Sequence, residues 1–195
     1  MPATAMPKKD TISKRSFDDA IGGVHAHTFG LDPDAEEYLL TVLEREYIAY
    51  ALALYYNCSH CQEYHGRVVD RLRKKDSLPE RQWRKDVARA ILFLRVEIDV
   101  ISSSEREEWM QTWRSFGSRI NQLSLHLPCY IASAIGMARD DDSLIELVGR
   151  RFSEVFPDKD DRTSRTADIL EVVSFMKAAA SKNRVEPKVI SAYGL

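Results

Sequence analysis

The sequence predicts an all-α fold of about seven or eight helices. Its 195 residues include only 8 Gly and 7 Pro, too few for a loop-rich or all-β fold. Helix-capping residues precede several of the segments that lack Gly and Pro. Strict alternation of apolar and polar residues, which is typical of a strand, stands out at 94–101. Since its neighbours are helical in pattern, we assign this stretch to the end of a helix.

The elements begin after a polar arm. Residues 1–16 are predicted to form a flexible arm, and residues 22–30, which start and end with glycine, a loop. Asp32 can cap a helix, and Pro33 suits its first position. Since neither Gly nor Pro occurs over 34–61, we expect helix throughout this interval, apart from one break.

Asn57 is the only plausible break in that interval, because Asn tolerates the left-handed conformation that ends many helices. Residues 17–183 are predicted to form one helical domain, followed by a C-terminal tail at 184–195. Four further helices are predicted over 58–75, 79–96, 129–138 and 163–181. Two more follow capping segments: one runs from the cap at 102–105 to residue 123, and the other from the cap at 140–143 to residue 155.

The composition excludes several classes of protein. Lys and Arg number 28 against 30 Asp and Glu, so the net charge of −2 argues against nucleic-acid binding. The longest apolar run, 47–56, is half of the about 20 residues that a membrane helix needs. The N-terminus lacks the apolar core of a secretory signal. We therefore expect a cytoplasmic protein, in which three cysteines favour catalysis or metal binding over a disulfide scaffold.

Cysteine and histidine concentrate in one short segment. Four of the chain's eight Cys and His residues lie within 58–65. On a helix, Cys61 and His65 lie about 60° and about 20° from Cys58, so all three share one face. His60 lies about 200° from Cys58, on the opposite side.

This arrangement suits thiol chemistry. A Cys-X-X-Cys pair near a helix start gains from the helix dipole, which favours the reactive thiolate. A histidine one turn away can accept the thiol proton. The second cysteine can then convert a sulfenic acid into a disulfide.

Two alternatives remain open on the residues alone. The cluster could serve a non-catalytic helical protein as a structural zinc site or a partner-binding site, although zinc would need a further ligand from elsewhere. Both cysteines could instead be small buried core residues.

Two more residues extend the pattern to that of a known family. Glu46 lies twelve residues before Cys58, and His60 directly precedes Cys61. With Cys58-X-X-Cys61-X-X-X-His65, this set resembles the redox motif of the AhpD-like alkylhydroperoxidases, in the carboxymuconolactone decarboxylase superfamily. The resemblance covers about 46–65. It implies an all-α domain with the cysteine pair near the start of a helix, and a homo-oligomer such as a dimer, trimer or hexamer.

The resemblance also implies an activity. By analogy, the protein would be an antioxidant peroxidase without metal or cofactor, in which Cys61 attacks the hydroperoxide and Cys58 resolves the intermediate. Glu46 and His65 would relay the proton from Cys61, and His60 completes the motif. The implied partners are a hydroperoxide, a dithiol electron donor such as a lipoyl carrier, and a peroxiredoxin.

The number of residues between Glu46 and His65 limits how a proton relay between them could be built. A continuous helix would separate Glu46 from His65 by about 28 Å. A hairpin with its turn at Asn57 would bring Glu46 to the level of His65 rather than of Cys61, which favours a relay through the histidine.

The basic residues that follow the motif depart from the family, whose members often carry small residues there. They include Arg67, Arg71, Arg73, Lys74 and Lys75. The run suits a helix C-terminus, and a docking site for an acidic or carboxylate-bearing carrier is the alternative.

Overall fold

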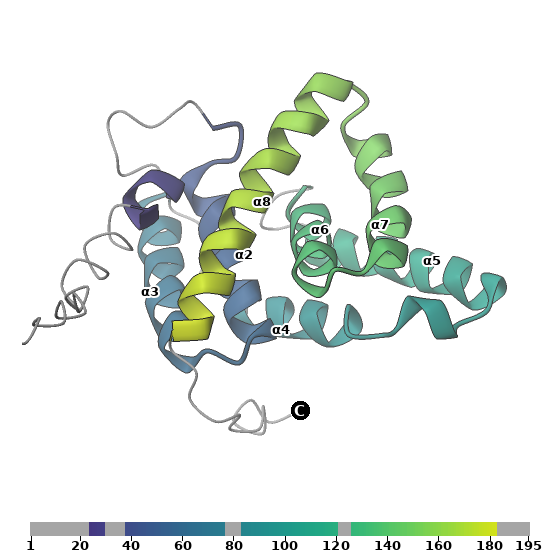
Figure 1. The fold of residues 1–195 in the computed structure, drawn as a ribbon, viewed down its shortest axis with the longest axis horizontal. Helices are drawn as coiled ribbons and strands as arrows, with labels where there is room; N and C mark the ends of the chain where they lie inside the picture. The colour runs from purple at the N-terminus through teal and green to yellow at the C-terminus, as the bar shows by residue number, and fades with distance from the viewer. Residues whose placement is uncertain (1–23, 30–37, 77–82, 121–125, 183–195) are drawn as a thin grey trace, which may run out of the picture. The chain divides into compact units, whose positions relative to one another are not determined.

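The described residues form α-helices and one short 3₁₀ helix, with no strand among them, which confirms the all-α class. The computed structural model describes residues 24–29, 38–76, 83–120 and 126–182 (Figure 1). The chain divides into two compact units, residues 1–35 and residues 36–195. The predicted arm at 1–16 and tail at 184–195 lie outside the described residues.

The first unit is described only at 24–29, where the prediction of a loop was wrong. Residues 24–28 are helical. The amide of Phe29 donates to the carbonyl of His25 at 3.0 Å, and the two rings lie 4.8 Å apart between their centroids. This one-turn aromatic contact supports a helical turn despite the flanking glycines.

The second unit is organised around α2, which packs against α3, α4, α6 and α8. Ten consecutive residues of α2, 45–54, are buried, so the long apolar run belongs to a core helix. The helices are α2 (Val42–Tyr55), α3 (Ser59–Lys75), α4 (Trp83–Phe93), α5 (Ser103–Ile120), α6 (Leu127–Arg139), α7 (Asp142–Val155) and α8 (Lys159–Lys182).

The start of α2 differs from the prediction. Asp32 and Pro33 lie outside the described residues, and residues 38–41 are not helical. Thr41 caps the helix instead. Its hydroxyl accepts from the Glu44 amide at 3.2 Å, while the Glu44 carboxylate accepts from the Thr41 amide at 2.9 Å. This reciprocal capping box fixes the first turn of α2 at Val42.

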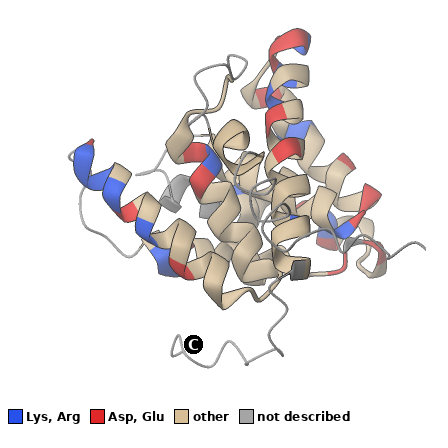
Figure 2. Ribbon diagram, turned by 60° about the vertical axis from the view of Figure 1, so that its left-hand side comes forward, with Lys and Arg blue, Asp and Glu red and all other residues tan. Residues whose placement is uncertain are grey.

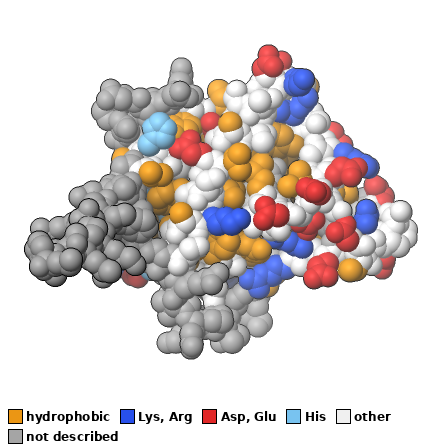
Figure 3. Space-filling view, in the orientation of Figure 1, with side chains coloured by type: hydrophobic (Ala, Val, Ile, Leu, Met, Phe, Trp, Pro, Cys, Tyr) orange, Lys and Arg blue, Asp and Glu red, His pale blue; other side chains and the backbone are white. Residues whose placement is uncertain are grey.

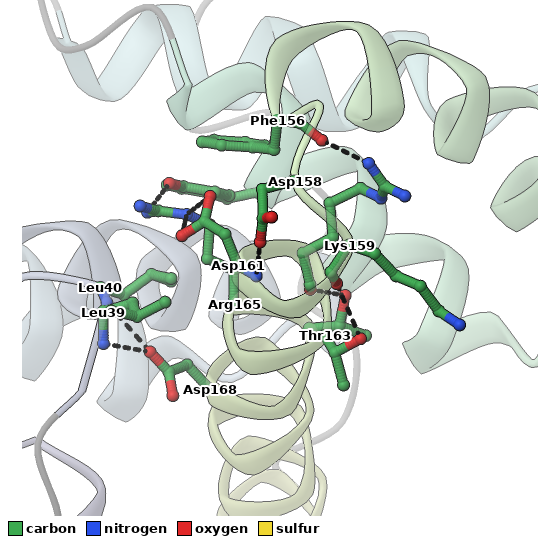
Figure 4. Close-up of polar contacts among 12 residues, drawn as sticks. Leu39, Leu40, Phe156, Asp158, Lys159, Asp161, Thr163, Arg165 and Asp168 are labelled. Atoms are coloured by element: carbon green, nitrogen blue, oxygen red, sulfur yellow. Dashed lines mark hydrogen bonds and ion pairs between the residues drawn. The ribbon is translucent and has the colours of Figure 1, made fainter.

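The segment before α2 is anchored to α8. One carboxylate oxygen of Asp168 accepts from the backbone amides of Leu39 and Leu40, both at 2.9 Å (Figure 4). The Tyr38 hydroxyl donates to the carboxylate of Glu171, one turn further along α8. These contacts join parts of the chain that lie more than 120 residues apart in sequence.

The remaining helices follow the prediction with two corrections. The stretch 94–101 is neither a strand nor the end of an α-helix: α4 ends at Phe93, and a 3₁₀ turn, η1 (Ile98–Val100), follows. The Leu94 carbonyl accepts from Arg139 at 2.6 Å, outside any helix. The last helix begins at Lys159 rather than Thr163, because the Asp158 carboxylate caps the Asp161 amide at 2.7 Å.

The capping residues predicted for α5 and α7 are confirmed. Ser102 and Glu105 form a reciprocal box before α5. The Asp141 carboxylate accepts from the amide of Leu144 at 2.9 Å at the start of α7. Of the helix predicted over 79–96, the residues before 83 lie outside the described part of the chain, as do residues 121–123 of the following one.

Asn57 separates α2 from α3, as predicted, and has a φ of 55°. The amides of Asn57 and Cys58 donate back to the carbonyls of Leu54 and Ala53, at 3.2 and 2.9 Å. This is the hydrogen-bond pattern of a Schellman motif, which satisfies carbonyls at a helix C-terminus. The left-handed residue turns the chain so that α3 packs against α2.

Replacing Asn57 tests this turn. We expect Asn57→Ala to lower the free energy of unfolding by about 1 kcal/mol, because a left-handed conformation costs alanine roughly that much. Asn57→Gly should stay within about 0.5 kcal/mol of the wild type. Urea unfolding of the oxidised protein measures both values. Asp140, with a φ of 53° after α6, provides the matched control, where glycine should also be tolerated. An alanine variant as stable as the wild type would contradict this account of the turn.

Candidate functional site

Cys58 and Cys61 lie at the start of α3 and are joined as a disulfide, with 5.3 Å between their Cα atoms. Cys58 is the N-cap of the helix, and its sulfur accepts from the amide of Cys61 at 3.3 Å. Each residue is only 4% exposed. The prediction that the pair occupies a helix start is confirmed, and the dipole of α3 acts on both sulfurs.

Glu46 and His65 form a buried pair one helical turn beyond Cys61. Glu46 lies in the middle of α2, and His65 lies in the second turn of α3. One carboxylate oxygen of Glu46 lies 2.7 Å from Nδ1 of His65. Glu46 is 2% exposed and His65 is 3% exposed. The predicted hairpin is confirmed, and it brings Glu46 to the level of His65, as the spacing predicted.

Electrostatics explains why Glu46 and His65 are buried together. A carboxylate without a partner in the core would be costly, so the histidine stabilises it there. With an ionised Glu46, Nδ1 carries the proton and donates to the carboxylate. The other ring nitrogen, Nε2, is then in the acceptor form. The arrangement therefore holds the imidazole in the tautomer that can take a proton.

His60 lies apart from this pair. It is exposed, whereas Cys61 and His65 are buried. The helical geometry predicted this separation. His60 lines a shallow surface groove of about 200 Å³ along α3, together with Glu63, Tyr64, Arg67, Val68 and Arg71.

Two further residues adjoin the pair and were not identified from the sequence. Arg45, next to Glu46 in α2, is 3% exposed, and its guanidinium lies 3.9 Å from the ring centroid of Tyr38. Burial lowers the pKa of Arg45, while the charges of Tyr38, Asp168, Glu171 and Glu46 act against this shift. The ring of Tyr64 meets the imidazole of His65 edge-on, with centroids 5.1 Å apart.

These two residues carry different signals in the sequence. Tyr64 follows Cys61 by three positions, so helical spacing places it beside the site. Arg45 has no such signal, because a charged residue beside Glu46 is equally compatible with a position exposed to solvent.

Cys129, the third cysteine, is buried in α6. Burial raises the pKa of this thiol to about 11. At neutral pH it is therefore almost wholly protonated and unreactive.

The described residues contain neither a group of metal ligands nor a membrane-spanning helix. Among them, no three or more His, Cys, Asp and Glu side chains gather in a group suited to a metal ion. The sulfurs of Cys58 and Cys61, which the zinc alternative needs as ligands, are bonded to each other. None of the described helices has both the length and the apolar character of a membrane span.

The chain matches no protein-family model, no curated protein and no solved structure. The similarity to the AhpD-like motif therefore stays a prediction that rests on Glu46, Cys58, His60, Cys61 and His65 alone.

A double-mutant cycle tests the energetic link between Glu46 and His65. We expect Glu46→Ala, His65→Ala and the double variant to give a coupling energy of about 2 kcal/mol, because either single change leaves a buried polar partner unpaired. Urea unfolding of the four proteins supplies the measurement.

The matched control is the ion pair between Glu63 and Arg67, which is exposed on the same helix. The same cycle there should give less than about 0.5 kcal/mol. Equal coupling energies for the buried and exposed pairs would contradict the assignment.

Proposed function

We propose that the protein is a thiol-dependent hydroperoxidase that uses Cys58 and Cys61 as its redox pair. The hydrogen bond between Glu46 and His65, buried one turn from Cys61, is the observation that carries the proposal. A disulfide alone would fit a structural role. A buried carboxylate that fixes the tautomer of a neighbouring histidine fits proton transfer to or from a thiol.

The first step of the proposed cycle oxidises Cys61. Its thiolate attacks the outer oxygen of the hydroperoxide, an S–O bond forms and the O–O bond breaks. The alkoxide leaves and takes up a proton to become the alcohol. Cys61 is left as a sulfenic acid, two electrons more oxidised than the thiol.

The second step forms the disulfide seen in the structure. The Cys58 thiolate attacks the sulfur of the sulfenic acid, the S–S bond forms, and hydroxide leaves and is protonated to water. In the disulfide the Cα atoms lie 5.3 Å apart, within the usual range for this bond. A dithiol donor then returns both cysteines to thiols.

Glu46 and His65 have a defined part in this cycle. His65 takes the proton from the Cys61 thiol through Nε2, while Glu46 stabilises the imidazolium through Nδ1. Because the pair is buried, this charge interaction is screened less than it would be at the surface. The proton can then pass to the departing alkoxide, so His65 acts first as a base and then as an acid.

The two cysteines should respond differently to substitution. We expect Cys61→Ser to abolish consumption of an organic hydroperoxide, since the attacking thiol is lost. Cys58→Ser should allow one turnover and stop at a sulfenic acid that dimedone traps at Cys61. Thiol counts before and after one equivalent of hydroperoxide, with mass spectrometry, measure both results.

Cys129→Ser is the control, and it should behave as the wild type because that thiol stays protonated. Wild-type protein should lose two thiols per chain and regain them with dithiothreitol. Three thiols that do not respond to hydroperoxide would refute the proposed function and favour the structural alternative.

The relay predicts a pH-dependent defect. We expect Glu46→Gln to slow the oxidation of Cys61 by about 100-fold near pH 7, the contribution typical of a positioned general base. The defect should narrow as the pH rises, because hydroxide then removes the thiol proton. Stopped-flow mixing of reduced protein with hydroperoxide across a pH series gives the rates.

Glu63→Gln, an exposed change on α3, is the matched control and should leave the rate unaltered. A Glu46→Gln variant that reacts at the wild-type rate at every pH would remove Glu46 from the mechanism. A defect that is the same at every pH would indicate a purely structural role.

A further inference from the structure

The outward side of α3 carries a continuous stripe of basic and aromatic side chains. All of its members are exposed, whereas Cys61, His65 and Val69 lie on a neighbouring side of the helix that is buried. At about 100° per residue, the members fall within about 100° of arc. The basic stripe consists of His60, Tyr64, Arg67, Arg71, Lys74 and Lys75.

The charge of the basic stripe is poorly balanced locally. Arg67 pairs with Glu63, but Arg71, Lys74 and Lys75 form no ion pair with a carboxylate of the described residues. Figure 2 shows Lys and Arg repeated along α3 toward its C-terminal end. On the face of the molecule seen in Figure 3, positive and negative side chains are intermixed instead.

Favourable interaction with the helix dipole accounts for only part of the basic stripe. The last turn of α3 contains Lys74 and Lys75, which lie where the dipole favours cations. Arg71 and Arg67 lie before that turn. The ion pair with Glu63 accounts for Arg67, whereas Arg71 has no such pair among the described residues.

The basic stripe begins at the end of α3 that carries the cysteine pair. His60 and Ser59 are exposed in the first turn of α3, and Cys58 and Cys61, at the same end of the helix, are each 4% exposed. From His60 to Lys75 the stripe extends about 22 Å along the helix axis. The shallow groove runs along most of the stripe, from His60 to Arg71, and Glu63 also lines it.

We propose that the basic stripe is the docking surface for the electron donor, an acidic protein that carries a dithiol. This inference rests on the proposed function and adds the place and the charge of the partner. The length of the stripe and the shallowness of the groove favour a protein surface over a small ligand. Unbalanced cations that extend from the disulfide steer a negatively charged partner toward it.

The reductive step then balances as a thiol–disulfide exchange. A thiolate of the docked donor attacks one sulfur of the Cys58–Cys61 bond, which breaks and leaves the other sulfur as a thiolate. The second donor thiolate breaks the mixed disulfide. Two electrons pass to the protein, both cysteines end as thiols after taking up two protons, and the donor leaves as a disulfide.

Charged dithiol peptides test the proposal. The probes are two reduced Cys-Gly-Pro-Cys peptides, one with a glutamate tail and one with a lysine tail. For each peptide, the rate at which it reduces the protein disulfide is divided by the rate at which it reduces a neutral small-molecule disulfide. This normalised rate removes differences in the intrinsic reactivity of the two peptides. At low salt we expect the normalised rate of the acidic peptide to exceed that of the basic peptide by roughly tenfold. Added salt should remove the difference.

Two charge-reversed triple variants locate the effect. Arg71→Glu/Lys74→Glu/Lys75→Glu should abolish or invert the preference and leave reduction by dithiothreitol unchanged. Arg95→Glu/Lys159→Glu/Lys177→Glu changes the net charge equally at exposed positions outside α3, and should keep the preference.

Each other outcome is decisive. Equal normalised rates for the two peptides, or an equal loss in both triple variants, would overturn the docking surface. An altered oligomeric state of the α3 variant in sedimentation would overturn it in favour of a contact between copies of the chain. If hydroperoxide fails to reoxidise the reduced pair, the proposed function fails, whereas the peptide preference is measured independently.

Discussion

The buried contact between Glu46 and His65 is the interaction on which the candidate site depends. A carboxylate in the middle of a core helix needs a partner, and its partner lies nineteen residues further along the chain. Only a sharp reversal between α2 and α3 brings the two together. The left-handed Asn57, the Schellman hydrogen bonds behind it and the packing of α3 on α2 all serve that reversal.

Cys58 links the turn to the chemistry. Its amide closes the end of α2, and its sulfur caps the start of α3. The same residue therefore ends one helix, begins the next and provides half of the disulfide. The disulfide therefore lies at the turn of the α2–α3 hairpin, one helical turn from the Glu46–His65 contact.

The residues of the candidate site were easier to predict from the sequence than the ends of the helices. A break at Asn57 and helical spacing placed Glu46 at the level of His65 and His60 on the side of α3 opposite Cys58. Helical position alone favours a solvent-exposed Glu46, and only the resemblance to the AhpD-like motif assigned this residue to the site. The start of α2 was mispredicted because the stretch after Asp34 contains no Gly or Pro, and the decisive capping box at Thr41 lay inside it. Asp168, which fixes Leu39 and Leu40, could not be found, since no local pattern links residues about 130 positions apart.

The residues of the candidate site lie close together in the sequence, whereas the contacts of Asp168 and Glu171 with residues 38–40 join distant parts of the chain. Short loops close at a smaller entropic cost than long ones, and local contacts form early in folding. The α2–α3 hairpin can therefore assemble while the contacts of α8 with the segment before α2 are still open. Oxidation of Cys58 and Cys61 closes a loop of only a few residues, so the disulfide acts on the local turn and restricts the unfolded chain less than a long-range disulfide would. In the proposed cycle, each change between thiols and disulfide would therefore act on this one turn, and not on the remote anchors of α8.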